Sequence, residues 1–231
     1  MDGMVLLDKP SGVTSRQALG MVKRKLGLKK GGFLGTLDPL ATGLLVCFFG
    51  EATKLIRHFE GADKMYEVTF ELGKSSDTFD CTGKVEQVSE LWKRLTQVEL
   101  EQAILLQTGE HWQTQPRFSA IRRHGKRSYE LARAGVDFAL GKRQVNILEA
   151  TLLSCDFPVV RVRMICSSGT YVRAWVHELG ERLGCGAVMT ALRRSGVGLW
   201  RLDQSVSVED VGHGHLLDSG EIRRRYLAHV R

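Results

Sequence analysis

The residue best suited to chemistry is a single acid inside a glycine-rich connector. Residues 31–43 read GGFLGTLDPLATG, so four glycines and one proline surround one carboxylate, Asp38. The Asp38-Pro39 step by itself is typical of a simple turn. The apolar run at residues 44–49 (LLVCFF) favours a strand buried on both faces, and a polar loop leading into such a strand is a common place for a reactive group. Asp38 is therefore a candidate nucleophile.

An acid in this setting needs a cation nearby. A carboxylate beside an apolar strand is costly to keep ionised unless a positive charge pairs with it. Arg173 is one candidate, because it lies in the first turn of an expected helix, shortly after the turn sequence SSG at residues 167–169. An aspartate held ionised by an arginine in a cleft is suited to attack on an electrophilic carbon. Taken alone, Arg173 fits a phosphate contact or a surface residue equally well.

Several other kinds of site lack support. No GxxxxGK[ST], GxGxxG or GxSxG pattern occurs, so phosphate-binding loops, dinucleotide sites and hydrolase elbows lack their motifs. His213 and His215 are spaced as a metal pair, but no further ligand is spaced to complete the site. The five cysteines are scattered without a CxxC pair, so the sequence predicts reduced thiols.

The charge of the chain points to an anionic partner. The formal net charge is +7, and a polyphosphate backbone attracts clustered lysines and arginines because each contact releases counterions. Residues 111–145 hold eight lysines and arginines against two acids, and a second basic run lies at residues 23–30. The alternative interpretation is two solvated faces without a partner.

Length and hydropathy set the class of protein. The 231 residues, 43% of them hydrophobic, can form one sizeable core, although two small domains remain possible. No apolar run approaches the ~18 residues of a membrane span, and the N-terminal MDGMVLLDKP lacks a basic segment followed by an apolar core. We therefore expect a soluble, cytoplasmic protein.

Strands and helices alternate without the regular rhythm of a doubly wound sheet. Strand patterns occur at residues 4–7, 44–49, 66–72 and 160–166, the third with a strict period of two that turns Tyr66 inward. Helices are expected at 15–26, 96–106 and 170–183, with Ser15 as the cap of the first and a capping box at 96–99. The favoured class is α+β with a mixed, largely antiparallel sheet flanked by helices.

Four ordered segments resemble the TruB family of tRNA pseudouridine synthases. GTLDPLATG at 35–43 is similar to the family's catalytic loop, and LDKPSG at 7–12 to its N-terminal motif. DKMYEV at 63–68 is similar to the strand that supplies the active-site tyrosine, and SGTYVR at 168–173 to the segment that supplies the arginine. LRR at 192–194 matches a late family element, so the resemblance covers residues 4–208.

The resemblance implies a fold with a central active-site cleft and an isomerisation of uridine to pseudouridine without a cofactor or a metal. Asp38 would be the nucleophile that helps to break the C1′–N1 bond, after which the base turns and rejoins through C5. Tyr66 would stack on the base, which must be flipped out of its loop, and Arg173 would pair with Asp38. Core packing explains Tyr66 equally well from the sequence alone.

The resemblance also implies an RNA-binding surface, with the segment at about 111–145 as the family's RNA clamp. The residues expected to bind substrate are Lys9, Phe33, Tyr171, Leu192, Arg122, Arg123 and Lys126. Phe33 departs from the family pattern, which usually has a histidine there that stacks in the space left by the flipped base. Phe33 keeps the stacking but no polar contact.

The resemblance places the catalytic domain at residues 1–208 and a short tail or helix at 209–231, with no PUA-type RNA-binding domain. The expected partner is the T-stem loop of tRNA, with modification at the uridine numbered 55, and we expect a monomer without an obligatory protein partner. The alternative is a non-catalytic tRNA-binding or tRNA-folding protein on the same scaffold. A third interpretation, a subunit acting under a guide RNA, is weakened by the small size of the chain.

Overall fold

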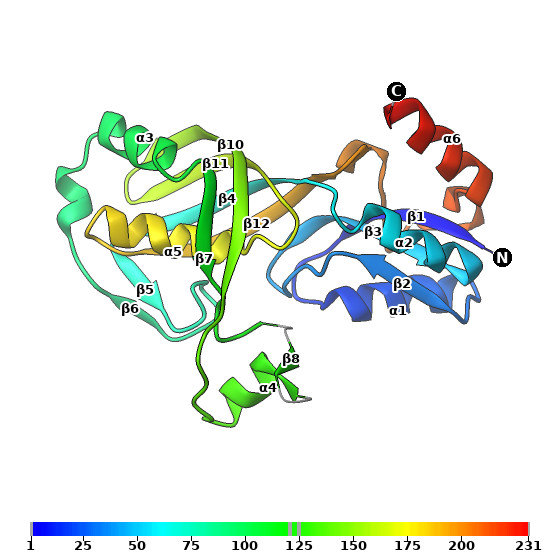
Figure 1. The fold of residues 1–231 in the computed structure, drawn as a ribbon, viewed down its shortest axis with the longest axis horizontal. Coiled ribbons are helices and arrows are strands. Elements are labelled where there is room, and N and C mark those ends of the chain that lie inside the picture. Colours follow the sequence, from blue (N-terminus) through cyan, green and yellow to red (C-terminus); the bar gives the residue numbers. More distant parts are fainter. Residues whose placement is uncertain (1, 120–121, 124–125, 231) are drawn as a thin grey trace. The chain divides into compact units, whose positions relative to one another are not determined.

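The computed structural model describes all residues except 1, 120–121, 124–125 and 231, and only the backbone of 122–123, 126–127, 129, 133 and 227–230. The chain forms two compact units. Unit 1 consists of residues 1–67 and 192–231, and unit 2 of residues 68–191. Both contain sheets flanked by helices, which confirms the α+β class (Figure 1).

The sheet of unit 1 has the order β14-β1-β3-β12. β1 (Gly3–Lys9) pairs antiparallel with β3 (Thr42–Phe49), and β2 (Gly31–Leu34) pairs with the same strand. The later part of β12 (Ala187–Val197) runs parallel to β3. β13 (Trp200–Arg201) pairs with β12, and β14 (Val206–Ser207) pairs with β1.

β1 and β3 are buried on both faces, as the unbroken apolar run in β3 predicts. One face packs on α1 (Ser15–Lys25) through Val5, Ala18, Val22 and Leu45. Ser15 is the first residue of the helix and not its cap: Thr14 is the cap and forms a capping box with Gln17, so the helix begins one residue earlier than predicted.

The opposite face of this sheet holds a second core. It contains α2 (Ile56–Phe59), Trp200 and α6 (Ser219–Val230), whose Ile222 is 1% exposed. Phe59 contacts the rings of Phe48, Trp200 and Tyr226. Short 3₁₀ turns lie at Gly50–Leu55, Leu202–Gln204 and His213–His215.

The sheet of unit 2 has the order β12-β4-β11-β10-β7. It is formed by β4 (Lys64–Leu72), β7 (Gly109–Thr114), β10 (Lys142–Asp156) and β11 (Val159–Cys166). Burial alternates residue by residue along β4, as predicted. α5 (Val172–Arg182) packs on this strand, with the Trp175 ring edge-on to Phe70 at 6.5 Å.

Smaller elements complete unit 2. α3 (Gln97–Leu105) begins at the predicted capping box of Thr96 and Glu99. The 3₁₀ turn Leu91–Arg94 precedes it, and α4 (Ser128–Arg133) follows later in the chain. Two short hairpins pair β5 (Lys74–Ser76) with β6 (Val85–Gln87), and β8 (Arg122–Arg123) with β9 (Lys126–Arg127). Within the described part of the chain, every helix is too short or too polar to cross a membrane.

Candidate active site

Asp38 lies half-buried on the loop between β2 and β3 in unit 1. The loop begins at Gly35 (φ 65°) and ends at Gly43 (φ 97°). Residues with a side chain rarely adopt these positive φ angles. A Cβ atom at Gly43 would lie 2.4 Å from the backbone oxygen of Arg194. Gly43 therefore lets β3 approach β12 where the loop ends.

Ser15 and Lys9 hold the middle of this loop. The hydroxyl of Ser15 donates to the Leu37 carbonyl at 3.0 Å and accepts from the Leu37 N–H at 2.8 Å. Lys9 is 0% exposed. Its Nζ donates to the carbonyls of Pro10 (2.8 Å), Val13 (2.7 Å) and Pro39 (3.3 Å). The residues on both sides of Asp38 are thus fixed by buried donors.

Arg194 holds the two ends of the loop. Its side chain is 0% exposed, and Nε donates to the Leu44 carbonyl at 2.7 Å. Nη2 donates to the carbonyls of Gly35 at 3.1 Å and Leu34 at 3.4 Å. A buried guanidinium requires such acceptors, because an unsatisfied buried charge is very costly.

The electrostatics of the loop are set by these cations. Burial lowers the pKa of Lys9 to about 8, while the Asp38 carboxylate opposes this change and the Arg194 charge adds to it. Asp38 therefore interacts with the Lys9 ammonium, and two buried cations support the segment that carries the candidate nucleophile. Asp38 is thus the acid of the loop that lies within the field of these cations.

Tyr66 lies on β4 and is 6% exposed. Lys64, two residues earlier on the same face of the strand, reaches the start of the loop: its Cε would be 3.3 Å from a Cβ atom at Gly35. Leu192 is 8% exposed on β12, and its carbonyl accepts from Thr42 Oγ1 at 3.5 Å. Unit 1 thus carries Asp38, Lys9, Tyr66 and Leu192. It also carries Phe33, which lies half-exposed on β2 opposite Cys47.

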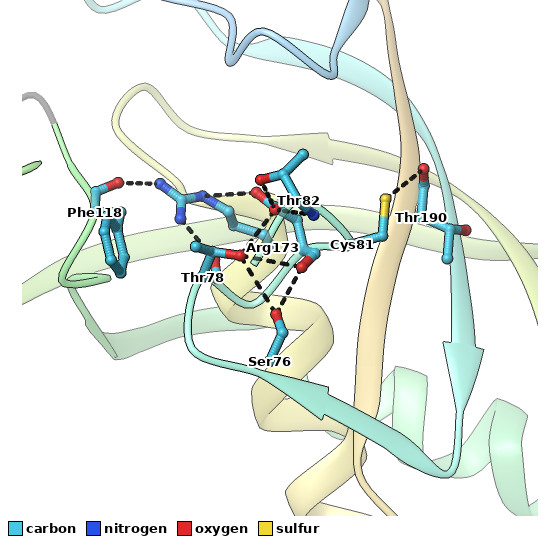
Figure 2. Close-up of polar contacts among 8 residues, drawn as sticks. Ser76, Thr78, Cys81, Thr82, Phe118, Arg173 and Thr190 are labelled. Atoms are coloured by element: carbon cyan, nitrogen blue, oxygen red, sulfur yellow. Dashed lines mark hydrogen bonds and ion pairs between the residues drawn. The ribbon is translucent and has the colours of Figure 1, made fainter. Parts of the chain in front are cut away.

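Arg173 lies in the first turn of α5 in unit 2 and is 4% exposed. Its Nη1 donates to the Thr78 carbonyl at 2.7 Å, and its Nη2 to the Phe118 carbonyl (Figure 2). Its Nε lies 4.0 Å from Oδ2 of Asp80. The Tyr171 ring is 5.9 Å from the guanidinium carbon.

Asp80 is the acid that faces Arg173. It is 5% exposed, and its Oδ1 accepts from Thr78 Oγ1 at 2.9 Å, from the Thr82 N–H at 2.9 Å and from the Thr82 hydroxyl. The Ser76 hydroxyl donates to its carbonyl at 2.6 Å. Asp80 is thus held in one orientation with its other oxygen toward the guanidinium of Arg173.

The start of α5 is fixed by one side chain of β7. Gln113 is 1% exposed, and its amide brackets the Tyr171 peptide: Oε1 accepts from the Tyr171 N–H at 2.8 Å, and Nε2 donates to the Tyr171 carbonyl at 3.1 Å. These two hydrogen bonds fix the first turn of α5, whose N-cap residue Tyr171 makes no capping bond with its own side chain.

Three expected RNA-binding residues lie in the hairpin of β8 and β9. Arg122 pairs with Arg127 and Arg123 with Lys126 in an antiparallel register. The side chains of these residues lie outside what the structure describes, so their expected contacts with RNA stay predictions. The pairing of Asp38 with Arg173 also stays a prediction, because the two residues belong to different units.

Four residues of this site were missed by the sequence analysis. Arg194 was noted only as part of a motif and Ser15 only as a helix cap, and Asp80 was not singled out. Gln113 carried no signal. For the histidine pair, the structure shows that His215 Nδ1 accepts from the Gly212 N–H at 3.1 Å. Among the residues that the structure describes, no three histidine, cysteine, aspartate or glutamate side chains gather as they would around a metal ion.

The fold of the chain is shared with solved structures. The chain aligns with a chain of a Cbf5-Nop10-Gar1 complex with a TM-score of 0.70 and 26% identity, over 90% of this chain and 53% of the other. It aligns with an archaeal box H/ACA sRNP Nop10-Cbf5 complex with a TM-score of 0.66 and 24% identity, over 90% of this chain and 52% of the other. The fold is therefore of the pseudouridine-synthase type, to which the matching family model also belongs.

The family follows from the sequence matches. The model of the N-terminal domain of TruB family pseudouridylate synthases matches residues 23–172, and the model of the tRNA pseudouridylate synthase B C-terminal domain matches residues 173–230. The chain belongs to the TruB family of pseudouridylate synthases.

Curated relatives agree with this assignment. Proteins named tRNA pseudouridine synthase B from Burkholderia lata and Syntrophus aciditrophicus are 46% and 42% identical to the chain, over 90% and 93% of it. One from Geobacter sulfurreducens is 41% identical over 90% of the chain. The chain spans 64–68% of the length of these three relatives.

Proposed function

We propose that the protein isomerises a uridine in the T loop of tRNA, at position 55, to pseudouridine, with Asp38 as the nucleophile. The observation that carries the proposal is the loop itself: a half-buried aspartate interacts with one buried cation, and the backbone around it is tied down by Lys9, Ser15 and Arg194. A nucleophile must be held in one place to act on a bound substrate. Membership of the TruB family supports the same conclusion.

The reaction moves a base on its sugar and consumes nothing. Asp38 assists cleavage of the C1′–N1 bond, the uracil turns, and C5 joins C1′ in place of N1. C5 then loses its hydrogen, and N1 gains one. The uridine must leave its stack for this to occur, and Tyr66 supplies an aromatic ring against which the extruded base stacks.

Arg173 pairs with Asp38 in this proposal. Its guanidinium is held by the Thr78 and Phe118 carbonyls and faces Asp80. A cation so firmly held can stabilise charge in the transition state without reorganising during the reaction. The basic residues at 111–145 attract the phosphates around the target loop.

The test is tritium release from a T-loop transcript made with 5-tritiated uridine, using the purified protein. We expect release without any added cofactor. Asp38→Asn should lower the rate by on the order of a thousandfold or more while RNA affinity changes little. The matched control is Asp203→Asn, an exposed acid of the same unit, which should keep the wild-type rate.

Two outcomes contradict the proposal. If the wild-type protein binds the transcript but releases no tritium, the chain is a tRNA-binding scaffold without turnover. If Asp38→Asn loses binding and rate in equal measure, Asp38 is structural. Mapping pseudouridine in the product tests the position of the modified uridine.

A further inference from the structure

Helix α5 contacts two successive residues, Thr78 and Phe79, of the loop that faces Arg173. Arg173 and His177 lie four positions apart, and therefore on the same face of α5. Arg173 donates to the carbonyl of Thr78, and the His177 ring stacks on the ring of Phe79 with centroids 4.0 Å apart and planes 11° from parallel. The segment of residues 78–80 is thus held by one helix face.

Phe79 has an unusual backbone. Its φ angle is 64°, and it is the one described residue other than glycine with a positive φ. A side chain disfavours this region, so such a conformation persists only where the surroundings enforce it. The Phe79 N–H donates to the Ser76 carbonyl at 3.2 Å, and its carbonyl accepts from the Met189 N–H at 3.3 Å. The stacked ring is a third restraint.

His177 contributes through its ring face. Its Nδ1 is buried and has no hydrogen-bond partner within the described residues. Burial lowers the pKa of His177, against the opposing charge of Glu181, so the ring is held neutral at neutral pH. A neutral imidazole without a bond at Nδ1 acts here as a flat partner for Phe79, which an aromatic hydrocarbon ring could replace.

The conformation of Phe79 determines where its two neighbours point. Thr78 presents its carbonyl to Arg173, and Asp80 presents its carboxylate, one on each side of Phe79 in the chain. A return of Phe79 to an ordinary negative φ would rotate the adjoining peptides and separate these two groups. Arg173 would then lose an acceptor or its facing acid.

We propose that Phe79 and His177 form a positioning pair that sets the guanidinium of Arg173 through the Thr78–Asp80 segment. The inference rests on the proposed function in one respect, the catalytic use of Arg173. Neither residue of the pair needs to touch the substrate. Their expected effect is therefore on turnover rather than on RNA binding.

The experiment compares His177→Ala with His177→Phe, which keeps a stacking ring. We expect His177→Ala to lower kcat by about tenfold with KM for the transcript within about twofold of wild type, because misplaced groups slow chemistry more than binding. His177→Phe should recover most of the loss. Glu181→Gln, a charge change beside His177 that leaves both rings intact, is the matched control and should match wild type.

A double-mutant cycle separates positioning from general stability. In an Arg173→Ala background, measured in single turnover, His177→Ala should have little further effect if it acts through Arg173. An equal loss in both backgrounds, or a loss that His177→Phe does not restore, would overturn the proposal. So would an unchanged kcat for His177→Ala.

A readout independent of activity distinguishes this inference from the proposed function. The NMR signal of the Arg173 Nε–H should shift in His177→Ala and return in His177→Phe. If the wild-type protein has no activity but these shifts occur, the proposed function fails and the positioning pair stands. Unchanged signals in both variants would refute the pair even in an active enzyme.

Discussion

Ser15, the first residue of α1, and Leu37, the residue before Asp38, are joined by two reciprocal hydrogen bonds of 3.0 and 2.8 Å. The helix that packs on β1 and β3 therefore also holds the backbone of the loop that carries Asp38. A single hydroxyl satisfies both polar groups of the Leu37 backbone, and both residues are buried.

Ser15→Ala should destabilise the protein by about 1–3 kcal/mol, because it leaves buried backbone groups of Leu37 unsatisfied. It should also lower kcat, since Asp38 loses a fixed neighbour. Urea unfolding and tritium release measure the two effects. Ser11→Ala removes an exposed hydroxyl bond to the Leu40 carbonyl of the same loop and should change both quantities far less. Equal effects of the two variants would contradict this role of Ser15.

Arg194→Lys should impair both folding and turnover, although the charge is kept. A lysine has one nitrogen and cannot bind the Leu44 and Gly35 carbonyls in the geometry of a guanidinium. We expect a loss of about 2–4 kcal/mol in the free energy of unfolding. Arg193→Lys is the matched control. Nη2 of Arg193 pairs with Oδ2 of Asp8 at 2.7 Å, and both side chains are half-exposed. Such exposed pairs contribute about 0–1 kcal/mol to stability. Comparable losses would refute the assignment.

Asp80→Asn should reduce kcat by about ten- to a hundredfold with RNA affinity nearly unchanged. The amide keeps the size of the carboxylate but removes the negative charge 4.0 Å from Nε of Arg173. Single-turnover rates and filter binding measure the two quantities. Asp77→Asn, three residues earlier, changes an exposed acid that accepts from the Lys84 N–H and should retain activity. A normal rate for Asp80→Asn would mean that Arg173 does not depend on this acid.

The stability of the protein should depend on His177 between neutral and acidic pH. Burial lowers the pKa of His177 from its ordinary value of 6.5, so below that value the unfolded chain binds more protons than the folded one. The contribution of His177 to the free energy of unfolding therefore decreases as the pH falls below 6.5. The difference between wild type and His177→Phe in urea unfolding should change accordingly from pH 7.5 to 5.5. A constant difference would show that His177 titrates normally.

Phe33→His should change turnover modestly and leave tRNA affinity nearly unaltered. Phe33 is half-exposed and packs against the core between α1 and β3. A histidine there would lose part of this apolar contact and add polar ring nitrogens. By its resemblance to the family, the loop would usually carry a histidine at this position, and either ring can stack in the space that an extruded base leaves. Steady-state kinetics with one transcript tests this. A large loss of activity would show that Phe33 is specifically required.

Much of the fold could be predicted because burial leaves a periodic trace in the sequence. The alternation from Tyr66 to Leu72 predicted β4, and the apolar run at residues 44–49 predicted β3. The capping box at Thr96 predicted the start of α3. Such signals are local, so they need no knowledge of distant contacts.

The supporting residues of the site could not be predicted in the same way. Arg194 binds carbonyls some 150 residues away, and Gln113 binds the Tyr171 peptide from 58 residues away. Nothing in the neighbouring sequence marks an arginine or a glutamine for such a bond. The positive φ of Phe79 was equally hidden, because glycine and asparagine are the usual residues there.

The bonds of Arg194 to both Gly35 and Leu44 have one more consequence. The two ends of the segment between β2 and β3 are tied to a single rigid side chain, so the segment has a fixed length. An inserted or deleted residue cannot be accommodated by slippage at either end. We expect this stretch of the chain to tolerate replacements at some positions but no change in its residue count.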